Sequence, residues 1–427
     1  MRNLLGIAAA ALLFAGSALS LGATDFFARD FGARPDGVTL NTASIQAAID
    51  FASSRGGGRV VLDKGDYISG SIYLKNNVTL HIEKDAALVG SLNPYDYVKD
   101  PDAKWTALIL AVKQENIGLT GEGIVDGRGF DVGVRFVDFV HMGLIDDKLG
   151  NDRVNETIRP ENIHMYLCNN VTIKDITLKD PACWTQQYDK CRGLLIEGIT
   201  VDAKCYWNND GLDVVDCSDV IVRDCYIDSS DDSYCFKSHS NDGVSENILV
   251  ENCVGRSSAN GIKFGTYTRG KFKHFRFKNM TIFDTYRSAI TIATVDGAQI
   301  EDVEIDSLKS LNTGNPIFLR TGTRNVNGSQ VPCLKDVVIK NMYAEVPFDK
   351  PDAGYSYEGP VEDLPRNVCP SIIAGLPGLR IENVRMENIE IVYPGHADPE
   401  YAYAGTSKDD LGGLAVQASR SPEVSIW

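Results

Sequence analysis

The sequence lacks an excess of basic residues and has few histidines. Its 42 Lys and Arg residues are outnumbered by 58 Asp and Glu residues, which gives a formal net charge of -16. Nucleic acids require a basic surface, so this balance argues against a nucleic-acid partner, although an acidic glycan can still bind in a local basic pocket. The six histidines show no spacing typical of metal ligands, and we expect no metal site.

Long apolar runs are also missing after the first twenty residues. No internal run approaches the roughly 18 apolar residues that a membrane-spanning helix needs. Residues 1–20 combine Arg2, an apolar stretch and a small-residue site ending at Ser20, a pattern typical of a secretory signal peptide. We therefore expect an exported protein, secreted or periplasmic, whose ten cysteines are free to pair.

What the chain has in abundance is short β-branched runs that recur. Aligned on the first core apolar residue of each run, six of them follow one another at intervals of 23 to 28 residues. The aligned positions are Val171, Leu194, Val220, Ile248, Phe275 and Ile300. A period in the twenties with several strands per repeat indicates a β-solenoid, and the Leu/Asn consensus of leucine-rich repeats is absent. We predict one all-β domain over residues 21–427.

The two irregular parts of this pattern predict a cap and a loop. In residues 41–58, apolar residues recur at helical spacing between an Asn41 or Thr42 cap and a glycine stop. Such a helix would cover the open end of the solenoid, within a cap region of about residues 25–100. Residues 126–159 show no repeat, which is typical of a long loop that walls a binding cleft.

Most cysteines fit the repeat as small core residues. Cys168, Cys191 and Cys217 each lie three residues before an aligned apolar position, so we expect them to stack on one another inside the solenoid. The better disulfide candidates fall outside these columns, although the sequence does not assign pairs. They are Cys183, Cys205, Cys333 and Cys369.

Three aspartates fall at one edge of the predicted sheet. Matching the segments NDGLDVV, DDSYCFK, ANGIKFG and RSAITIA places Asp210, Asp232, Asn260 and Ser288 at equivalent positions of successive rungs, with Asp231 beside Asp232. When carboxyl groups are held this close, their pKa values move apart. We therefore expect one to stay protonated near neutral pH while another is ionised. Glycoside hydrolysis needs such an acid and base. Spacing alone leaves a calcium site or a solvated acidic surface open.

Several segments together resemble the polygalacturonases of glycoside hydrolase family 28. They are DFGARPDGVTLNTASIQAAID, GGGRVVLDKGDYISGSIYLKNNVTLHIEKDAALVGS, LTGEGIVDGRG, NNDGLDVVDC and DSSDDSYCFKS, and the likeness covers most of residues 25–345. The resemblance implies a right-handed parallel β-helix and inverting hydrolysis of a glycosidic bond without a cofactor. It also implies Asp231 as the general acid, with Asp210 and Asp232 activating the water.

The sequence departs from this family at its other motif residues. Where the family's Gly-His-Gly and Arg-Ile-Lys segments would place His, Arg and Lys, the chain has Asn260, Thr291 and Ala293. The Arg/Lys pair of the family grips a uronate carboxylate, so its absence argues against galacturonan as the substrate. Lys263 and Lys237 occupy the two basic columns on earlier rungs instead.

The expected partner is a polysaccharide or oligosaccharide, pectin-like or another acidic plant or algal glycan, bound by a monomer. The substrate-binding candidates around the aspartates are Lys263, Asn260, Asn209, Lys237, Arg287, Arg320 and Trp207. Two alternatives stay open. A polysaccharide lyase on the same fold would bind calcium through the acids and use Lys263 as its base. A non-catalytic glycan-binding solenoid would have kept the aspartates without the reaction.

Overall fold

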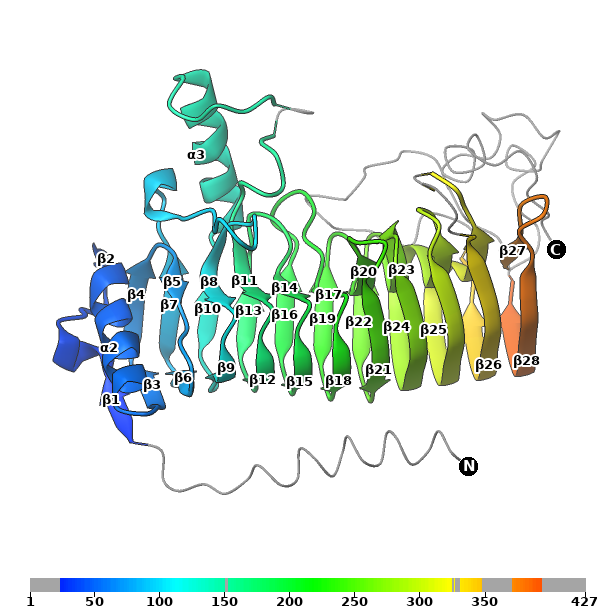
Figure 1. The fold of residues 1–427 in the computed structure, drawn as a ribbon, viewed down its shortest axis with the longest axis horizontal. Coiled ribbons are helices and arrows are strands. Elements are labelled where there is room, and N and C mark those ends of the chain that lie inside the picture. Colours follow the sequence, from blue (N-terminus) through cyan, green and yellow to red (C-terminus); the bar gives the residue numbers. More distant parts are fainter. Residues whose placement is uncertain (1–23, 150–152, 325, 327–330, 348–370, 394–427) are drawn as a thin grey trace.

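The computed structural model describes residues 24–149, 153–324, 326, 331–347 and 371–393. Over these residues the chain forms a right-handed parallel β-helix, as predicted, with short strands stacked rung on rung along one axis (Figure 1). The predicted signal peptide and Cys369 lie outside the described residues. Within the described ranges, no helix combines the length and the apolar character needed to cross a membrane.

Three ladders of parallel strands form the three faces of the β-helix. The first contains β1 (Asp25–Phe27), β3 (Gly58–Leu62), β6 (Val78–Ile82), β9 (Glu115–Thr120), β12 (Asn169–Lys174), β15 (Arg192–Glu197), β18 (Ser218–Arg223) and β21 (Val244–Glu251). The second contains β2 (Asp36–Leu40), β4 (Gly65–Ser69), β7 (Ala86–Gly90), β10 (Ile124–Asp126), β13 (Thr177–Lys179), β16 (Thr200–Ala203), β19 (Tyr226–Ser229) and β22 (Val254–Ser257). The third contains β5 (Ile72–Tyr73), β8 (Ala107–Val112), β11 (Glu161–Tyr166), β14 (Gln186–Asp189), β17 (Leu212–Val215), β20 (Tyr234–Ser238) and β23 (Asn260–Thr268).

Beyond residue 270 the faces run into one another, because long strands turn the corners of the coil without a break. These rungs are built by β24 (Lys271–Thr294), β25 (Gln299–Thr321), β26 (Cys333–Glu345), β27 (Ile372–Ala374) and β28 (Ile381–Val392). The helical elements are α2 (Thr42–Ser54), α3 (Gly129–His141) and the short 3-10 turns η1 (Ala28–Phe31) and η2 (Pro94–Asp96).

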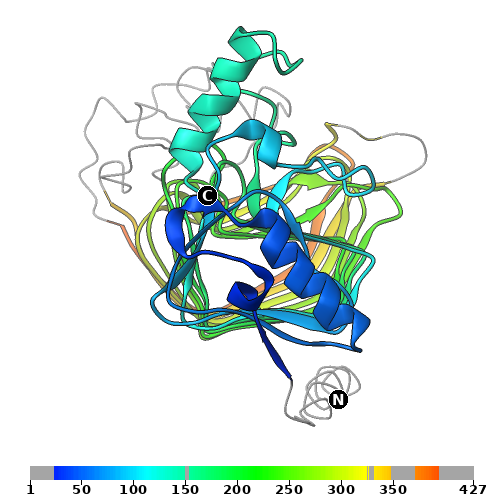
Figure 2. The same cartoon turned by 90° about the vertical axis from the view of Figure 1, so that its left-hand side faces the viewer.

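The predicted capping helix is present as α2. Its apolar stripe of Ile45, Ala48, Ile49 and Ala52 is fully buried. The helix lies across the N-terminal end of the coil, where it closes the core that the first rungs would otherwise expose (Figure 2). The helical spacing of these apolar residues therefore predicted both the element and its place.

The predicted register is confirmed except at its last step. The structure pairs Val171 with Leu194, and the ladder continues through Val220, Ile248 and Phe275 as expected. However, Phe275 pairs with Val303, whereas Ile300 pairs with Phe272 three residues earlier. The prediction of Ile300 as the next anchor is therefore wrong.

The physical reason is the backbone conformation of the residue before each anchor. Asn170, Asp219, Asn247 and His274 all have φ values between 53° and 59°, the left-handed conformation that Asn, Asp and Gly adopt most easily. Asp302, with φ 57°, occupies this position on the next rung, directly before Val303. The turn residue, rather than the first apolar residue, marks the register.

Residues 126–159 are only in part the predicted loop, because they contain the helix α3. Gly133 brings α3 against the turn after β16: a Cβ atom at this position would lie 2.6 Å from the ring of Tyr206. Phe130 adds an edge-on contact with the same ring, at 6.4 Å between centroids. The helix therefore rests on the turn between β16 and β17, which ends at Asp210.

The disulfide prediction is wrong for every candidate that the structure describes. Cys183, Cys205 and Cys333 all have free thiols, as do the other cysteines of the described ranges. Cys183 packs with Trp105 and Trp184 in a small apolar cluster, and the Cys205 thiol lies 3.5 Å from the carbonyl oxygen of Pro181. Close packing between rungs, rather than covalent links, fixes these segments.

Candidate active site

The three aspartates lie where two neighbouring rungs enter the third ladder. Asp210 precedes β17, and Asp231 and Asp232 precede β20. The Gly211 N–H donates to the carbonyl oxygen of Asp232 (2.8 Å), which aligns the two turns. Gly211 is required here, because a Cβ atom would lie 2.2 Å from the side chain of Ile227. The predicted convergence of the carboxyl groups follows from this alignment.

Asp210 is held by a buried lysine. Lys237 Nζ lies 2.8 Å from Asp210 Oδ2 and 2.5 Å from Asp213 Oδ1, and all three side chains are at most 5% exposed. Trp184 covers this group, with its ring centroid 3.4 Å from the ammonium. Burial and the charges of Asp213 and Asp232 raise the pKa of Asp210, while Lys237 opposes the shift. Lys237 therefore forms ion pairs with Asp210 and Asp213 inside the protein.

The register also differs from the prediction at Lys237. A β-bulge interrupts the pairing of β20 with β23 between Phe236 and Ser238, so Lys237 does not continue the column expected to lead to Ala293. Lys263, in contrast, pairs with Cys235 on one side and with Thr291 on the other, as predicted.

Asp232 has its own pair of donors on the following rung. The Asn260 Nδ2 amide donates to Asp232 Oδ1 (2.6 Å), and Lys263 Nζ lies 3.6 Å from Asp232 Oδ2. Thr291 in turn donates its hydroxyl proton to Asn260 Oδ1 (2.8 Å), which fixes the amide with its N–H groups toward the aspartate. Two of the residues that replace the family's motif residues therefore form one chain of hydrogen bonds ending on Asp232.

Asp231 is the most exposed of the three aspartates: it is half-buried, whereas Asp210 and Asp232 are buried. Its Oδ1 accepts a hydrogen bond from the Asp232 N–H (3.0 Å), and its carbonyl oxygen accepts from the hydroxyls of Ser229 (2.8 Å) and Ser257 (2.6 Å). Burial in the turn and the charges of Asp210 and Asp232 raise its pKa well above the ordinary value, and Arg287 opposes the shift. A raised pKa favours the protonated form, which is the form that can donate a proton.

The structure brings some of the other predicted binding residues to the aspartates. Arg287 interacts electrostatically with Asp231, and Trp207 lies half-buried in the turn that leads to Asp210. Asn209 is fully buried beneath the site: it donates to the carbonyl oxygens of Pro181 and Cys183 and accepts from two backbone N–H groups. This geometry gives Asn209 the task of shaping the turn.

Arg320 is not brought to the aspartates. It lies on β25, three rungs beyond Lys237, or about 14 Å at the usual spacing between strands. Its side chain is 8% exposed, and burial lowers its pKa to about 10.

Two arginines of the insertion were not predicted. Arg159 is 1% exposed and donates to the carbonyl oxygens of Val154, Ala182 and Trp207 and to Asn208 Oδ1. Arg153 stacks on Trp207, with 4.7 Å from its guanidinium carbon to the ring centroid. Neither carried a signal in the sequence, because both belong to a segment without repeats.

A metal ion fits poorly between the aspartates. Asp210, Asp232 and Cys235 each offer one ligand atom within 4.8 Å of the others. However, the same two carboxyl groups already face the ammonium groups of Lys237 and Lys263, and the Cys235 thiol donates to the carbonyl oxygen of Gly265 (2.9 Å). Two positive charges at this position disfavour calcium, which prefers a cage of oxygen ligands.

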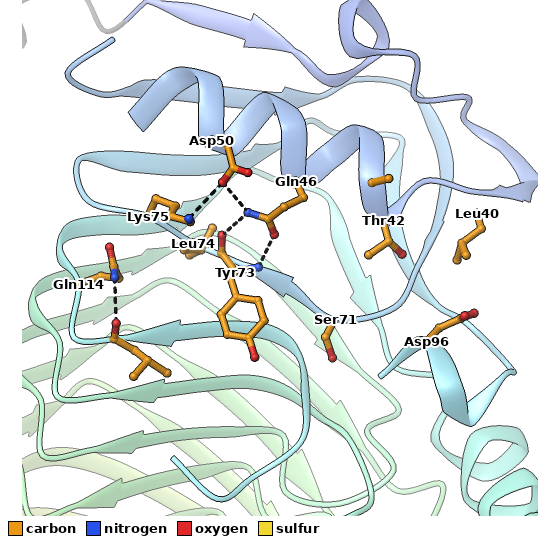
Figure 3. Close-up of a pocket in the computed structure, with 12 residues that line it drawn as sticks. Leu40, Thr42, Gln46, Asp50, Ser71, Tyr73, Leu74, Lys75, Asp96 and Gln114 are labelled. Atoms are coloured by element: carbon orange, nitrogen blue, oxygen red, sulfur yellow. Dashed lines mark hydrogen bonds and ion pairs between the residues drawn. The ribbon is translucent and has the colours of Figure 1, made fainter. Parts of the chain in front are cut away.

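A separate hollow of about 710 Å³ lies beside α2, away from the aspartates. Figure 3 shows Gln46 there bridging to the backbone of Tyr73 and to Asp50, which also pairs with Lys75 at 3.3 Å. Its polar groups therefore serve the contact between the capping helix and β5. The hollow offers no pair of free carboxyl groups among its lining residues.

Comparison with known proteins agrees with the fold. A family model described as "Glycosyl hydrolases family 28" matches residues 57–350. A curated "Probable polygalacturonase" from Vitis vinifera is 27% identical over 76% of this chain and 62% of its own length. An "Exo-poly-alpha-D-galacturonosidase" from Dickeya chrysanthemi is 25% identical over 48% of this chain and 40% of its own length. The matches thus span less than two thirds of either relative.

The fold is also shared with a solved structure. A hyperthermoactive exopolygalacturonase from Thermotoga maritima superposes with a TM-score of 0.66, covering 86% of this chain and 91% of that chain at 22% identity.

Proposed function

The chain belongs to the glycosyl hydrolases family 28, and from this premise we propose that it hydrolyses an O-glycosidic bond in a pectin-like or other acidic glycan. Asp231 is the general acid, and Asp210 and Asp232 hold and activate the attacking water. The observation that carries the proposal is the unequal setting of the carboxyl groups. Among the residues that the structure describes, no lysine forms an ion pair with Asp231, whereas each of the other two aspartates lies beside an ammonium group.

The proposed reaction follows from these settings. Asp231 gives its proton to the leaving oxygen of the glycosidic bond, while a water between Asp210 and Asp232 attacks the anomeric carbon from the opposite face. Asp232 is oriented for this task by Asn260, which occupies the place of the family's histidine. The aspartate pair takes up a proton from the water. Because the water attacks once, from the face opposite the leaving group, the product is the inverted sugar.

We also propose where the protein acts and in which state of assembly. We take residues 21–427 as one catalytic domain that acts as a monomer after export by the peptide predicted at residues 1–20. The expected partner is a polysaccharide or oligosaccharide. The names of the relatives, a probable polygalacturonase and an exo-poly-alpha-D-galacturonosidase, support a chain that contains uronate, whereas Thr291 and Ala293 in place of the family's Arg/Lys pair argue against galacturonan itself.

The test is a reducing-end assay of the mature protein and its Asp231→Asn variant on acidic and neutral plant and algal glycans. We expect new reducing ends from the wild type, none from the variant, and a β-to-α or α-to-β change of the first-formed anomer by NMR. Products that absorb in the ultraviolet would instead identify a lyase. Glycan binding by both proteins without any cleavage would identify a binding solenoid.

A further inference from the structure

The basic groups near the aspartates differ in how many of their hydrogen-bond donors are already used. Lys237 and Lys263 face carboxyl groups, and Arg159 donates to four acceptors. Arg153 contacts the Trp207 ring but makes no hydrogen bond or ion pair with any residue that the structure describes. Within the described ranges, no acceptor therefore engages its guanidinium.

The position of Arg153 is fixed by its neighbours. Arg159 donates to the carbonyl oxygen of Val154, the residue after Arg153, at 3.2 Å and to that of Trp207 at 2.8 Å. One buried side chain thus ties the insertion to the turn before β17 and holds Arg153 over the indole ring. A guanidinium stacked in this way loses little freedom when it binds an anion.

Arg153 also lies close to the proposed acid. The Asp231 N–H donates to the carbonyl oxygen of Asn209 (3.3 Å), two residues after the Trp207 on which Arg153 stacks. The negative charge of Asp231 in turn favours the charged form of Arg153. The nearby Glu156 accepts a hydrogen bond from the Tyr267 hydroxyl (3.2 Å) and forms no ion pair with Arg153. Arg153 is thus half-buried beside the reacting group, with a planar fork suited to an anion with two oxygen atoms.

We propose that Arg153, stacked on Trp207, binds the anionic group of the sugar unit next to the scissile bond and makes the site selective for charged glycans. This inference rests on the proposed function and deepens it. The anionic group is a carboxylate or a sulfate ester, because both offer paired oxygens to a guanidinium. The contact takes the place of the family's missing Arg/Lys pair from an unrelated segment of the chain.

The test compares matched oligosaccharides that differ in charge: oligogalacturonides, their neutral methyl esters, and sulfated galactan oligosaccharides. For the anionic series that the wild type cleaves, we expect Arg153→Ala to lower kcat/KM roughly 10- to 100-fold, mainly through KM. Arg153→Lys should recover part of the loss. Arg135→Ala, which removes an exposed arginine from α3, should change kcat/KM less than about twofold.

The comparison with neutral esters decides the outcome. Equal losses on charged and neutral oligosaccharides would show that Arg153 only supports the loop, and no loss on any anionic series would overturn the proposal directly. A loss of kcat/KM after Arg153→Ala that is confined to the oligogalacturonides identifies carboxylate as the recognised group, and a loss confined to the sulfated oligosaccharides identifies sulfate.

Failure of the proposed function is separable from failure of this inference. If no oligosaccharide is cleaved, calorimetric binding of the same series to the Asp231→Asn protein, with and without Arg153→Ala, tests the contact alone. Weaker binding of the anionic series after Arg153→Ala supports it. Absence of binding to every anionic oligosaccharide contradicts it.

Discussion

The Lys237 ammonium lies 2.8 Å from the Asp210 carboxylate, although both side chains are at most 5% exposed. Burial disfavours the charge on Lys237, but Asp210 and Asp213 outweigh this effect and raise its pKa well above the usual value. The lysine therefore stays charged under the Trp184 ring. It is a positioning residue for the aspartates.

Replacing this lysine should damage both stability and activity. Lys237→Met leaves Asp210 and Asp213 buried without their counter-charge, and we expect a loss of about 3–5 kcal/mol in the free energy of unfolding. We also expect kcat to fall roughly 100-fold with little change in KM, because Asp210 loses its orientation. Denaturant unfolding and steady-state kinetics measure the two effects, with Lys64→Met on an exposed turn as the control. An unchanged kcat in the folded variant would limit Lys237 to stability.

Removing links of the hydrogen-bond chain from Thr291 through Asn260 to Asp232 should lower kcat more the closer the link lies to Asp232. Asn260→Ala removes the direct hydrogen bond to Asp232, so we expect kcat to fall roughly 10- to 100-fold. Thr291→Val only frees the Asn260 amide to rotate, and a smaller fall of about 3- to 10-fold should follow. In the double variant the Thr291 effect should vanish. Additive losses on the logarithmic scale would show that the two residues act independently.

The contribution of Asp231 to the stability of the folded protein should decrease as the pH rises. Its pKa is raised in the folded protein, so above the unfolded value of 3.8 the folded state holds the proton more tightly. Stability should therefore fall with pH up to the folded pKa, by at most about 1.4 kcal/mol per pH unit. Asp231→Asn removes this dependence, and we expect the inactive variant to have a higher Tm than the wild type at pH 8 but not at pH 4. Parallel Tm curves for the two proteins would contradict the raised pKa.

Arg159 should hold the insertion in place through its planar fork. Arg159→Lys keeps the charge but cannot reach four acceptors, so we expect nearly the same result as for Arg159→Ala. Both variants should show faster hydrogen exchange in residues 153–159 and 205–209, while the rungs after β21 remain protected. Full protection in Arg159→Lys would mean that charge alone secures the insertion.

The repetitive part of the molecule was predictable from the sequence because each rung obeys the same local rules. Inward apolar residues repeat, and the segments NDGLDVV, DDSYCFK, ANGIKFG and RSAITIA pair as they were matched. Their inward residues form two columns, Leu212–Tyr234–Ile262–Ile290 and Val214–Phe236–Phe264–Ile292. The convergence of Asp210, Asp231 and Asp232 followed from that register. The misplacement of Ile300 arose because two apolar residues compete for the same role, and only the Asp302 backbone distinguishes them.

What the sequence did not disclose depends on contacts between non-repeating segments. The pairing of Lys237 with Asp210 and Asp213 requires knowledge of side-chain direction at a bulge. The contacts of Arg159 and Arg153 require the path of the insertion, which no period constrains. A periodic pattern predicts stacked neighbours, whereas these residues meet across segments that the pattern does not relate.

The residue in the left-handed conformation before each anchor sets the register of that rung of the β-helix. Asn116 and Asn170 both adopt it, and Val171 pairs with Ile117 even though the whole α3 excursion lies between them in the chain. The strand register of each rung is therefore set locally. A longer or shorter loop in one rung does not shift the register of the next. New recognition segments can be inserted at the rim over evolutionary time while the carboxyl groups below keep their spacing.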